Sequence, residues 1–171
     1  NGMFRVLLQK LEPALGYAPF DAIAAVMLGA RRCPCAIVLE SAAAGAPPGA
    51  TLVLNGRKTI GWQLAEPYVA LLSRECREGT GHSGSASRTH EDPGGRLRVL
   101  YTTVSPLPRL LVLGAGPDAV PLVEFADRLG WRVTVLDHRP ALLARRDLRG
   151  AERRQLVEPA QLAATLQLGR F

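Results

Sequence analysis

Runs of apolar and polar residues in the first hundred positions predict a small mixed domain. Apolar side chains recur at helical spacing from Ala22 to Arg31, with Asp21 in the place of an N-cap. The run CAIVLE, Cys35 to Glu40, is mostly apolar and predicts a buried strand. Helical spacing returns from Glu66 to Cys76, where one face carries Tyr68, Val69, Leu72 and Cys76.

A hairpin and a further strand complete the prediction for this domain. The small-residue loop SAAAGAPPGA leads into TLVLNGRKTIG, where Asn55-Gly56 between two β-rich runs signals a tight turn. LRVLYTTVSP, 97–106, is the last strand expected before a second domain. The intervening segment GTGHSGSASRTHEDPGG is rich in Gly, Ser and Thr and predicts a flexible surface loop. We therefore expect an N-terminal α+β domain at 1–105, with a flexible loop at 79–96.

A strand, a glycine turn, a helix and a second strand follow one another in the rest of the chain. The stretch RLLVLGAGPDAVPLVEFADRLGWRVTVLD has a strand at 109–113, Gly114-Ala115-Gly116, a helix at 118–130 and a strand at 132–136. This βαβ order is the one that a dinucleotide-binding turn requires. We therefore predict an α/β protein whose second domain, 106–171, is a Rossmann-like parallel sheet.

The pattern weakens after Pro140. It predicts helices at 141–149 and 160–168, with a very short strand at 155–157 between them. The domain then has about three strands, whereas a complete dinucleotide fold has about six. Either the chain is a fragment of such a fold, or another subunit completes the sheet. An open sheet edge tends to pair with a partner strand, which makes a homodimer one expected solution.

Each residue of the glycine turn has a task in holding an anion. Gly114 permits the tight backbone path, Gly116 lets the main chain approach a phosphate, and the small Ala119 allows close packing of helix on strand. The start of the helix presents N–H groups to the anion. Asp118 stands at the same place and brings a negative charge close to any pyrophosphate.

The end of the second strand supplies the other half of the predicted site. Asp137 follows the glycines by about 20 residues, where a carboxylate can accept hydrogen bonds from a ribose. His138 and Arg139 come next, so a 2′-phosphate is also an acceptable ligand group at this position.

The composition narrows the class of ligand. With 171 residues, 47% of them hydrophobic, the chain can bury one good core or two small ones. Lys and Arg outnumber Asp and Glu by 21 to 15, for a formal charge of +6. The densest basic patch, 139–154, has no ladder of aromatic residues on which bases would stack. A phosphate-bearing ligand or an acidic partner protein therefore fits the patch better than nucleic acid.

Nothing in the sequence predicts a membrane span or a secretion signal. The most hydrophobic early segment, 22–28, is too short to cross a bilayer and is followed by Arg31 and Arg32. We therefore expect a cytoplasmic protein without membrane contact. The chain has 3 cysteines, an odd number that argues against a disulfide framework.

The cysteines admit a functional and a structural interpretation. Cys33-Pro34-Cys35 could present two thiols to sulfur or a soft metal, because the neighbouring arginines favour thiolate. Their place at a junction of helix and strand favours buried structural thiols, and Cys76 lies on an apolar helical face. We predict no metal site and no catalytic residue, and we expect His82 and His90 to be solvated in the flexible loop.

The second strand ends in VTVLDHRP, 133–140, which goes beyond what nucleotide binding alone requires, as does Pro117-Asp118-Ala119 after the glycines. Together these residues resemble the C-terminal domain of the XdhC/CoxI family of xanthine dehydrogenase accessory factors. In that family a strand, a GAG turn, a helix and a strand ending VxVxDxRP recur. The likeness extends into the first domain, where CAIVLESAAAGAPPGATLVLNGRKTIG is similar to the family's strand, loop and hairpin.

One stretch departs from the family pattern. After the hairpin the family commonly has serine, glycine, glycine, cysteine and glutamate in succession. This chain has Trp62-Gln63-Leu64-Ala65-Glu66, which keeps the glutamate and loses the glycines and the cysteine. No role of that cysteine carries over to this chain.

The resemblance implies a chaperone for the molybdenum cofactor, molybdopterin, rather than an enzyme. It implies delivery of the cofactor, in sulfurated form, to a xanthine dehydrogenase-type molybdenum hydroxylase, with a cysteine desulfurase as a further partner. The cofactor-binding residues expected are Gly114, Gly116, Asp118, Ala119, Asp137 and Arg139. Two alternatives stay open. One is an NAD(P)-dependent oxidoreductase that uses the same turn, and the other is a docking adaptor for a dehydrogenase with an empty turn.

Overall fold

The computed structural model describes residues 6–79, 81, 84–92, 94–144 and 146–165. The chain divides into two compact units, 1–106 and 107–171, and each unit has its own hydrophobic core. The first unit is built on an antiparallel sheet and the second on a parallel sheet. The predicted fold class is therefore confirmed.

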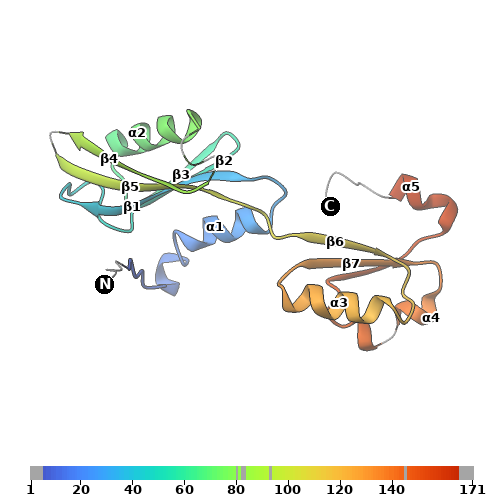
Figure 1. Ribbon diagram of the computed structural model, residues 1–171. Helices are drawn as coiled ribbons and strands as arrows, with labels where there is room; N and C mark the ends of the chain where they lie inside the picture. Colours follow the sequence, from blue (N-terminus) through green and yellow to red (C-terminus); the bar gives the residue numbers. More distant parts are fainter. Residues whose placement is uncertain (1–5, 80, 82–83, 93, 145, 166–171) are drawn as a thin grey trace, which may run out of the picture. The chain divides into compact units, whose positions relative to one another are not determined.

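Unit 1 holds a five-stranded sheet with the strand order β3-β2-β1-β5-β4 (Figure 1). Its strands are β1 (Cys33–Ser41), β2 (Thr51–Asn55), β3 (Lys58–Trp62), β4 (Ala86–Asp92) and β5 (Gly95–Val104). The predicted hairpin is confirmed, because Asn55 pairs with Lys58 and Gly56 adopts the positive φ, 62°, that tight turns favour.

One face of this sheet is covered by α2 (Glu66–Arg77), which lies above the sheet in Figure 1. Tyr68, Leu72 and Cys76 of this helix are buried in the larger core, as their helical spacing predicted. A short 3₁₀ turn, η1 (Pro13–Leu15), precedes the first helix of the unit.

Part of the opposite face is covered by α1 (Phe20–Met27), which packs through Ala22 and Val26. The prediction that Asp21 caps this helix is wrong, because Asp21 lies in the first turn and makes no capping hydrogen bond. The cause is local. The Tyr17 carbonyl accepts the N–H groups of residues 20 and 21, so the helical turn starts before Asp21.

The prediction of a flexible loop at 79–96 is wrong, because the segment contains β4, which pairs along its whole length with β5. The segment was predicted as a loop because it has few apolar residues. Polar contacts hold β4 in place instead. Arg88 donates to Glu75 of α2 at 2.7 Å, and the His90 Nε2 atom lies 2.8 Å from the Tyr101 hydroxyl. His90 is therefore half-buried and not a solvated loop residue.

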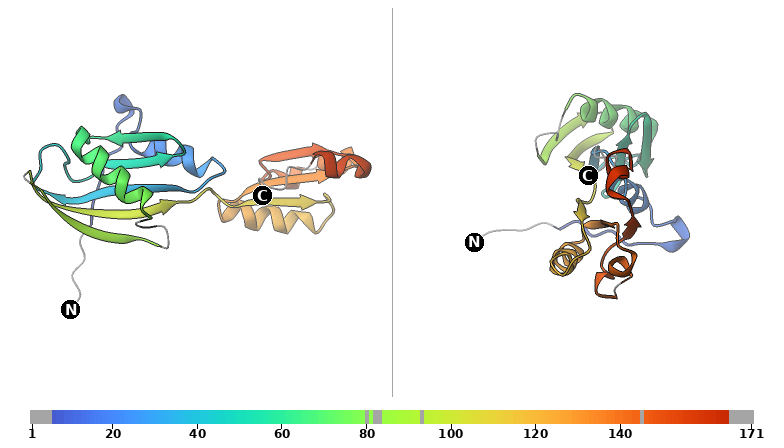
Figure 2. Two further views of the ribbon diagram at one scale, coloured as in Figure 1. Left: turned by 90° about the horizontal axis from the view of Figure 1, so that it is seen from above. Right: turned by 90° about the vertical axis from the view of Figure 1, so that its right-hand side faces the viewer.

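Unit 2 holds a three-stranded parallel sheet in the order β6-β7-β8. Its elements are β6 (Arg109–Leu113), α3 (Ala119–Arg128), β7 (Arg132–Asp137), α4 (Pro140–Leu143), η2 (Arg146–Leu148), β8 (Arg153–Leu156), η3 (Pro159–Gln161) and α5 (Leu162–Thr165). Val123 of α3 and Leu143 of α4 share one core with Val133 and Val135 of β7. Figure 2 shows α3 and α4 on the same side of the sheet. The predicted βαβ unit is confirmed.

The weaker patterns after Pro140 are confirmed in their order but not in their extent. The helix predicted at 141–149 is split into α4 and η2, and Leu143 and Leu148 anchor the two pieces in the core. The third strand begins at residue 153 instead of 155. The final helix is short within the described residues, and positions 166–168 of that prediction lie outside them.

Candidate functional site

The glycine turn joins β6 to α3 at the carboxyl end of the parallel sheet. Gly114 has a φ of 106°, which residues with a side chain rarely adopt, and its N–H donates to the Leu136 carbonyl at 2.7 Å. Ala115 and Ala119 are buried in the core of the unit. Gly114 thus provides the tight backbone path, and Ala119 allows helix and strand to pack closely.

Asp137 fastens this turn to the end of β7. One carboxylate oxygen, Oδ2, accepts the N–H of Ala115 at 2.6 Å and a guanidinium N–H of Arg139 at 2.9 Å. The other, Oδ1, accepts the Arg139 backbone N–H at 2.8 Å and its Nε–H at 3.0 Å. The Asp137 side chain is fully buried. Its hydrogen bonds to Arg139, with that from Ala115, hold the pKa of this carboxyl far below its usual range.

This geometry gives Asp137 a different task from the one that its position in the sequence suggests. A ribose hydroxyl needs a free carboxylate oxygen, but both oxygens already accept two hydrogen bonds each. A sugar diol would have to displace Arg139. Asp137 is therefore a positioning residue, which fixes the turn and orients Arg139.

A crevice opens beside the turn at the carboxyl ends of the strands, with a volume of about 240 Å³. Its lining consists of Leu113, Gly114, Leu136, Asp137, His138, Arg139, Val157, Pro159 and Leu162. The walls are mainly apolar, whereas the side chains of His138 and Arg139 are half-exposed at its rim. In open α/β sheets, ligands bind outside the carboxyl ends of the strands, which is where this crevice lies.

The turn leaves space and donors for an anion. An added Cβ at Gly116 would meet no atom of the described chain within 4 Å. The N–H groups of Ala119 and Val120 already donate to the carbonyls of residues 116 and 117. Those of Gly116 and Asp118 have no acceptor among the described residues, so they can donate to a ligand. The exposed carboxylate of Asp118 adds a negative charge beside these donors.

Leu113 and Leu136, in β6 and β7, line the crevice but were not predicted as site residues, and neither were three residues further along the chain, Val157, Pro159 and Leu162. These last three follow β8, and the Val157 N–H donates to the Asp137 carbonyl at 3.0 Å, which brings this segment to the end of β7. The signal that could have found them is their position directly after a third parallel strand, whose carboxyl end must meet the same edge of the sheet.

The cysteines do not contribute to this crevice. Cys33, Cys35 and Cys76 are buried in unit 1, so the interpretation as buried thiols is confirmed. Burial raises the pKa of Cys35 to about 12 and that of Cys76 to about 11, so neither is a thiolate at neutral pH. Among the described residues, no group of His, Cys, Asp and Glu could hold a metal ion. His82 lies outside these residues.

The stretch that departs from the family pattern keeps an unusual backbone. Gln63, exposed between β3 and α2, has a φ of 55°, in the left-handed region that favours glycine. Gln63 therefore adopts a conformation that glycine takes more easily, although it carries a side chain.

Comparison with known proteins indicates the family to which this domain is similar. Residues 110–168, which contain the turn and the crevice, match the sequence profile of the XdhC Rossmann domain. The chain carries an XdhC Rossmann domain. The resemblance to the XdhC family, which rested on the GAG turn and the VTVLDHRP ending, is confirmed.

Two relatives of this XdhC-domain chain are longer proteins. A probable xanthine dehydrogenase subunit of Bacillus subtilis (strain 168) is 53% identical over 38 residues, which are 22% of this chain and 12% of that protein. A crystal structure of a xanthine dehydrogenase from Bacillus halodurans has a TM-score of 0.54 and 20% identity, over 87% of this chain and 39% of that chain. The second likeness is one of fold. No helix in the described part of the XdhC-domain chain has the length and apolarity needed to span a bilayer.

Proposed function

We propose that this chain is an accessory protein of a xanthine dehydrogenase-type molybdenum hydroxylase and that it binds the molybdenum cofactor. The XdhC Rossmann domain and the names of both relatives support an accessory role in such a system. The observation that carries the cofactor part is the glycine turn, fastened by Asp137 at the mouth of an apolar crevice.

The crevice suits the two ends of molybdopterin, a flat pterin ring and a phosphate. Leu113, Leu136 and Leu162 offer apolar surface to the ring. The N–H groups of Gly116 and Asp118 and the half-exposed guanidinium of Arg139 can donate to the phosphate oxygens. The molybdenum would arrive bound to the cofactor itself, so the chain need not supply a metal ligand.

Asp118 adjusts the strength of this interaction. Its exposed carboxylate stands at the start of α3, next to the donors that face the phosphate, and the two negative charges repel each other. A carrier must release its cargo to the recipient enzyme, and moderate affinity serves that purpose. A cysteine desulfurase that sulfurates the bound cofactor, and the hydroxylase that receives it, are the partners proposed here.

The first test is calorimetric titration of the purified protein with molybdenum cofactor and, separately, with NADH and NADPH. We expect the cofactor to bind and the nicotinamides to be bound weakly or not at all. Gly116→Val should abolish binding because its side chain fills the phosphate space, and Gly116→Ala should weaken it less. Asp118→Asn should tighten binding several-fold. If Gly116→Val bound the molybdenum cofactor with unchanged affinity and had an unchanged thermal unfolding curve, the proposed site would be wrong.

An NADP-dependent oxidoreductase is the second candidate, and one observation favours it over an NAD-dependent enzyme. The carboxylate that would take a ribose diol is occupied, whereas Arg139 and His138 are half-exposed where a 2′-phosphate would lie. Binding of NADPH but not of cofactor, with substrate-dependent turnover, would support this candidate. Binding of neither ligand together with co-purification with a dehydrogenase would support the docking adaptor.

A further inference from the structure

The face of the unit 1 sheet on which α1 packs becomes polar beyond that helix. Arg98 of β5 pairs with Glu40 of β1 on one side and with Thr89 of β4 on the other. Directly opposed residues of antiparallel strands point to the same face. The intervening residues Leu97 and Val99 point into the core under α2, so these polar side chains point to the opposite face.

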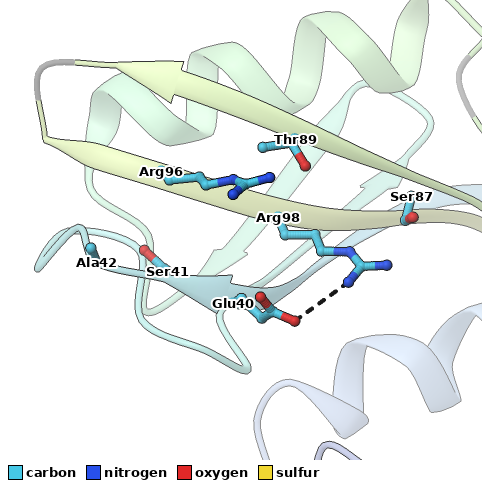
Figure 3. A pocket seen from close by; sticks show the side chains of 7 residues that line it. All are labelled: Glu40, Ser41, Ala42, Ser87, Thr89, Arg96 and Arg98. Atoms are coloured by element: carbon cyan, nitrogen blue, oxygen red, sulfur yellow. Dashed lines mark hydrogen bonds and ion pairs between the residues drawn. The ribbon is translucent and has the colours of Figure 1, made fainter. Parts of the chain in front are cut away.

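Figure 3 shows these side chains around one depression, whose lining includes no residue of a described helix. Its volume is about 650 Å³. Arg96 and Arg98 come from β5, Ser87 and Thr89 from β4, and Glu40, Ser41 and Ala42 from β1 and the residue that follows it.

Hydrogen-bond donors outnumber acceptors in this depression. Each guanidinium carries about five N–H donors, and the hydroxyls of Ser87 and Thr89 can donate as well. Glu40 is the one carboxylate in the lining. A group rich in acceptor oxygens and negatively charged is the ligand that such a set of side chains complements.

The existing ion pairs do not occupy the two arginines fully. Arg98 lies 3.4 Å from Glu40, and both side chains are nearly half-exposed. Arg96 lies 3.6 Å from Glu91, and both side chains are more than 70% exposed. Pairs of this length and exposure contribute little, so an anion can replace the carboxylates as partners of the two guanidinium groups.

We propose that this depression is a second ligand site, distinct from the glycine turn, which binds the phosphate group of a small molecule. Arg96 and Arg98 are separated by one residue on the same strand, so they lie about 7 Å apart at the backbone, and both side chains line the same depression. A phosphate has three terminal oxygens, which can take both guanidinium groups and a hydroxyl. A carboxylate has two oxygens and satisfies fewer of these donors.

The test is calorimetric titration of the full chain with pyrophosphate, with inorganic phosphate and, for comparison, with acetate. It is done in a Gly116→Val background, because this substitution closes the glycine turn to anions and leaves unit 1 untouched. We expect pyrophosphate to bind more tightly than phosphate, and acetate not to bind measurably. Arg98→Gln should weaken pyrophosphate binding at least tenfold, and Arg96→Gln should have a similar effect.

Two matched controls separate a site from general attraction by the basic chain. Arg57→Gln removes the same charge from the exposed turn between β2 and β3, which does not line the depression, and should leave affinity within twofold. Glu40→Gln removes the competing carboxylate and should tighten binding several-fold, whereas Glu78→Gln, which changes the net charge equally at the end of α2, should not. Equal losses in Arg57→Gln and Arg98→Gln would overturn the proposal, as would absence of pyrophosphate binding. Failure here leaves the proposal for the glycine turn unaffected, because that site is closed in every variant compared.

Discussion

The fastening of the glycine turn by Asp137 can be measured with a single substitution, Asp137→Asn. The carbonyl oxygen of asparagine can still accept hydrogen bonds. Its NH2 group, however, replaces the other carboxylate oxygen and cannot accept a bond from the N–H groups that face it. The buried backbone N–H of Ala115 then loses a charged acceptor at 2.6 Å. Hydrogen bonds to charged groups contribute about 1.5–3 kcal/mol each. The bonds to the half-exposed Arg139 side chain count for less because water screens them.

We therefore expect Asp137→Asn to lower the free energy of unfolding of unit 2 by about 2–3 kcal/mol. The assay is urea unfolding followed by tryptophan fluorescence in a Trp62→Phe background. The chain has 2 tryptophans, so Trp131, which lies between α3 and β7, then reports on unit 2 alone. A change below about 0.5 kcal/mol, the size usual for surface substitutions, would refute the argument that Asp137 holds the turn.

The difference in stability between the wild type and Asp137→Asn should depend on pH in one direction. The folded pKa of Asp137 is depressed, so its stabilising effect is fully present above the unfolded pKa of about 3.9 and is lost as the pH falls toward the folded value. The difference between wild type and Asp137→Asn should therefore shrink as the pH is lowered from about 5 to 2. A difference that stays constant over this interval would mean that the charge of Asp137 plays no part.

Three further predictions concern the backbone and the thiols. Gln63→Gly should raise the free energy of unfolding of unit 1 by about 0.5–1 kcal/mol, because it relieves a left-handed residue with a side chain, and Trp62 fluorescence in a Trp131→Phe background measures it. Gly114→Ala should lower the free energy of unfolding of unit 2 by about 1–2 kcal/mol, because residue 114 has a φ of 106°. An unchanged urea midpoint would contradict the need for glycine there. Cys33, Cys35 and Cys76 should not react with a thiol reagent at pH 7 until urea unfolds unit 1, since all three are buried with raised pKa values. Rapid labelling of the native protein would show that a thiol is accessible.

The elements with strong periodicity could be predicted from the sequence because their own residues define them. The strand at 109–113 has the bounds expected, and α2 extends one residue beyond its predicted end, since each is set by a local apolar pattern. The strand β4 could not be predicted in this way. Its stability comes from partners on α2 and β5, such as Glu75 and Tyr101, which lie outside the segment, 13 and 11 residues from Arg88 and His90.

The same distinction explains what was missed in the candidate site. The glycines could be recognised because their spacing is local. The partner of Asp137 could not, because the Ala115 N–H lies 22 residues away and comes close only when β6 and β7 pair in one register. Arg139 lies two residues from Asp137, so its ion pair was visible in principle. That Arg139 would compete with a ribose for the Asp137 carboxylate could be seen only from the hydrogen-bond geometry of the structure.

The position of β6 at the edge of its sheet has a consequence for ligand binding. In the part of the chain that the structure describes, the turn follows a strand with a neighbouring strand on one side, β7. A strand added along the other side of β6 would run beside the turn and would form a second wall for any ligand held there. Occupation of the turn and addition of that strand would then be thermodynamically linked, with each event strengthening the other by the same factor. Such reciprocity would let a recipient protein that docks at this edge sense whether the turn is loaded.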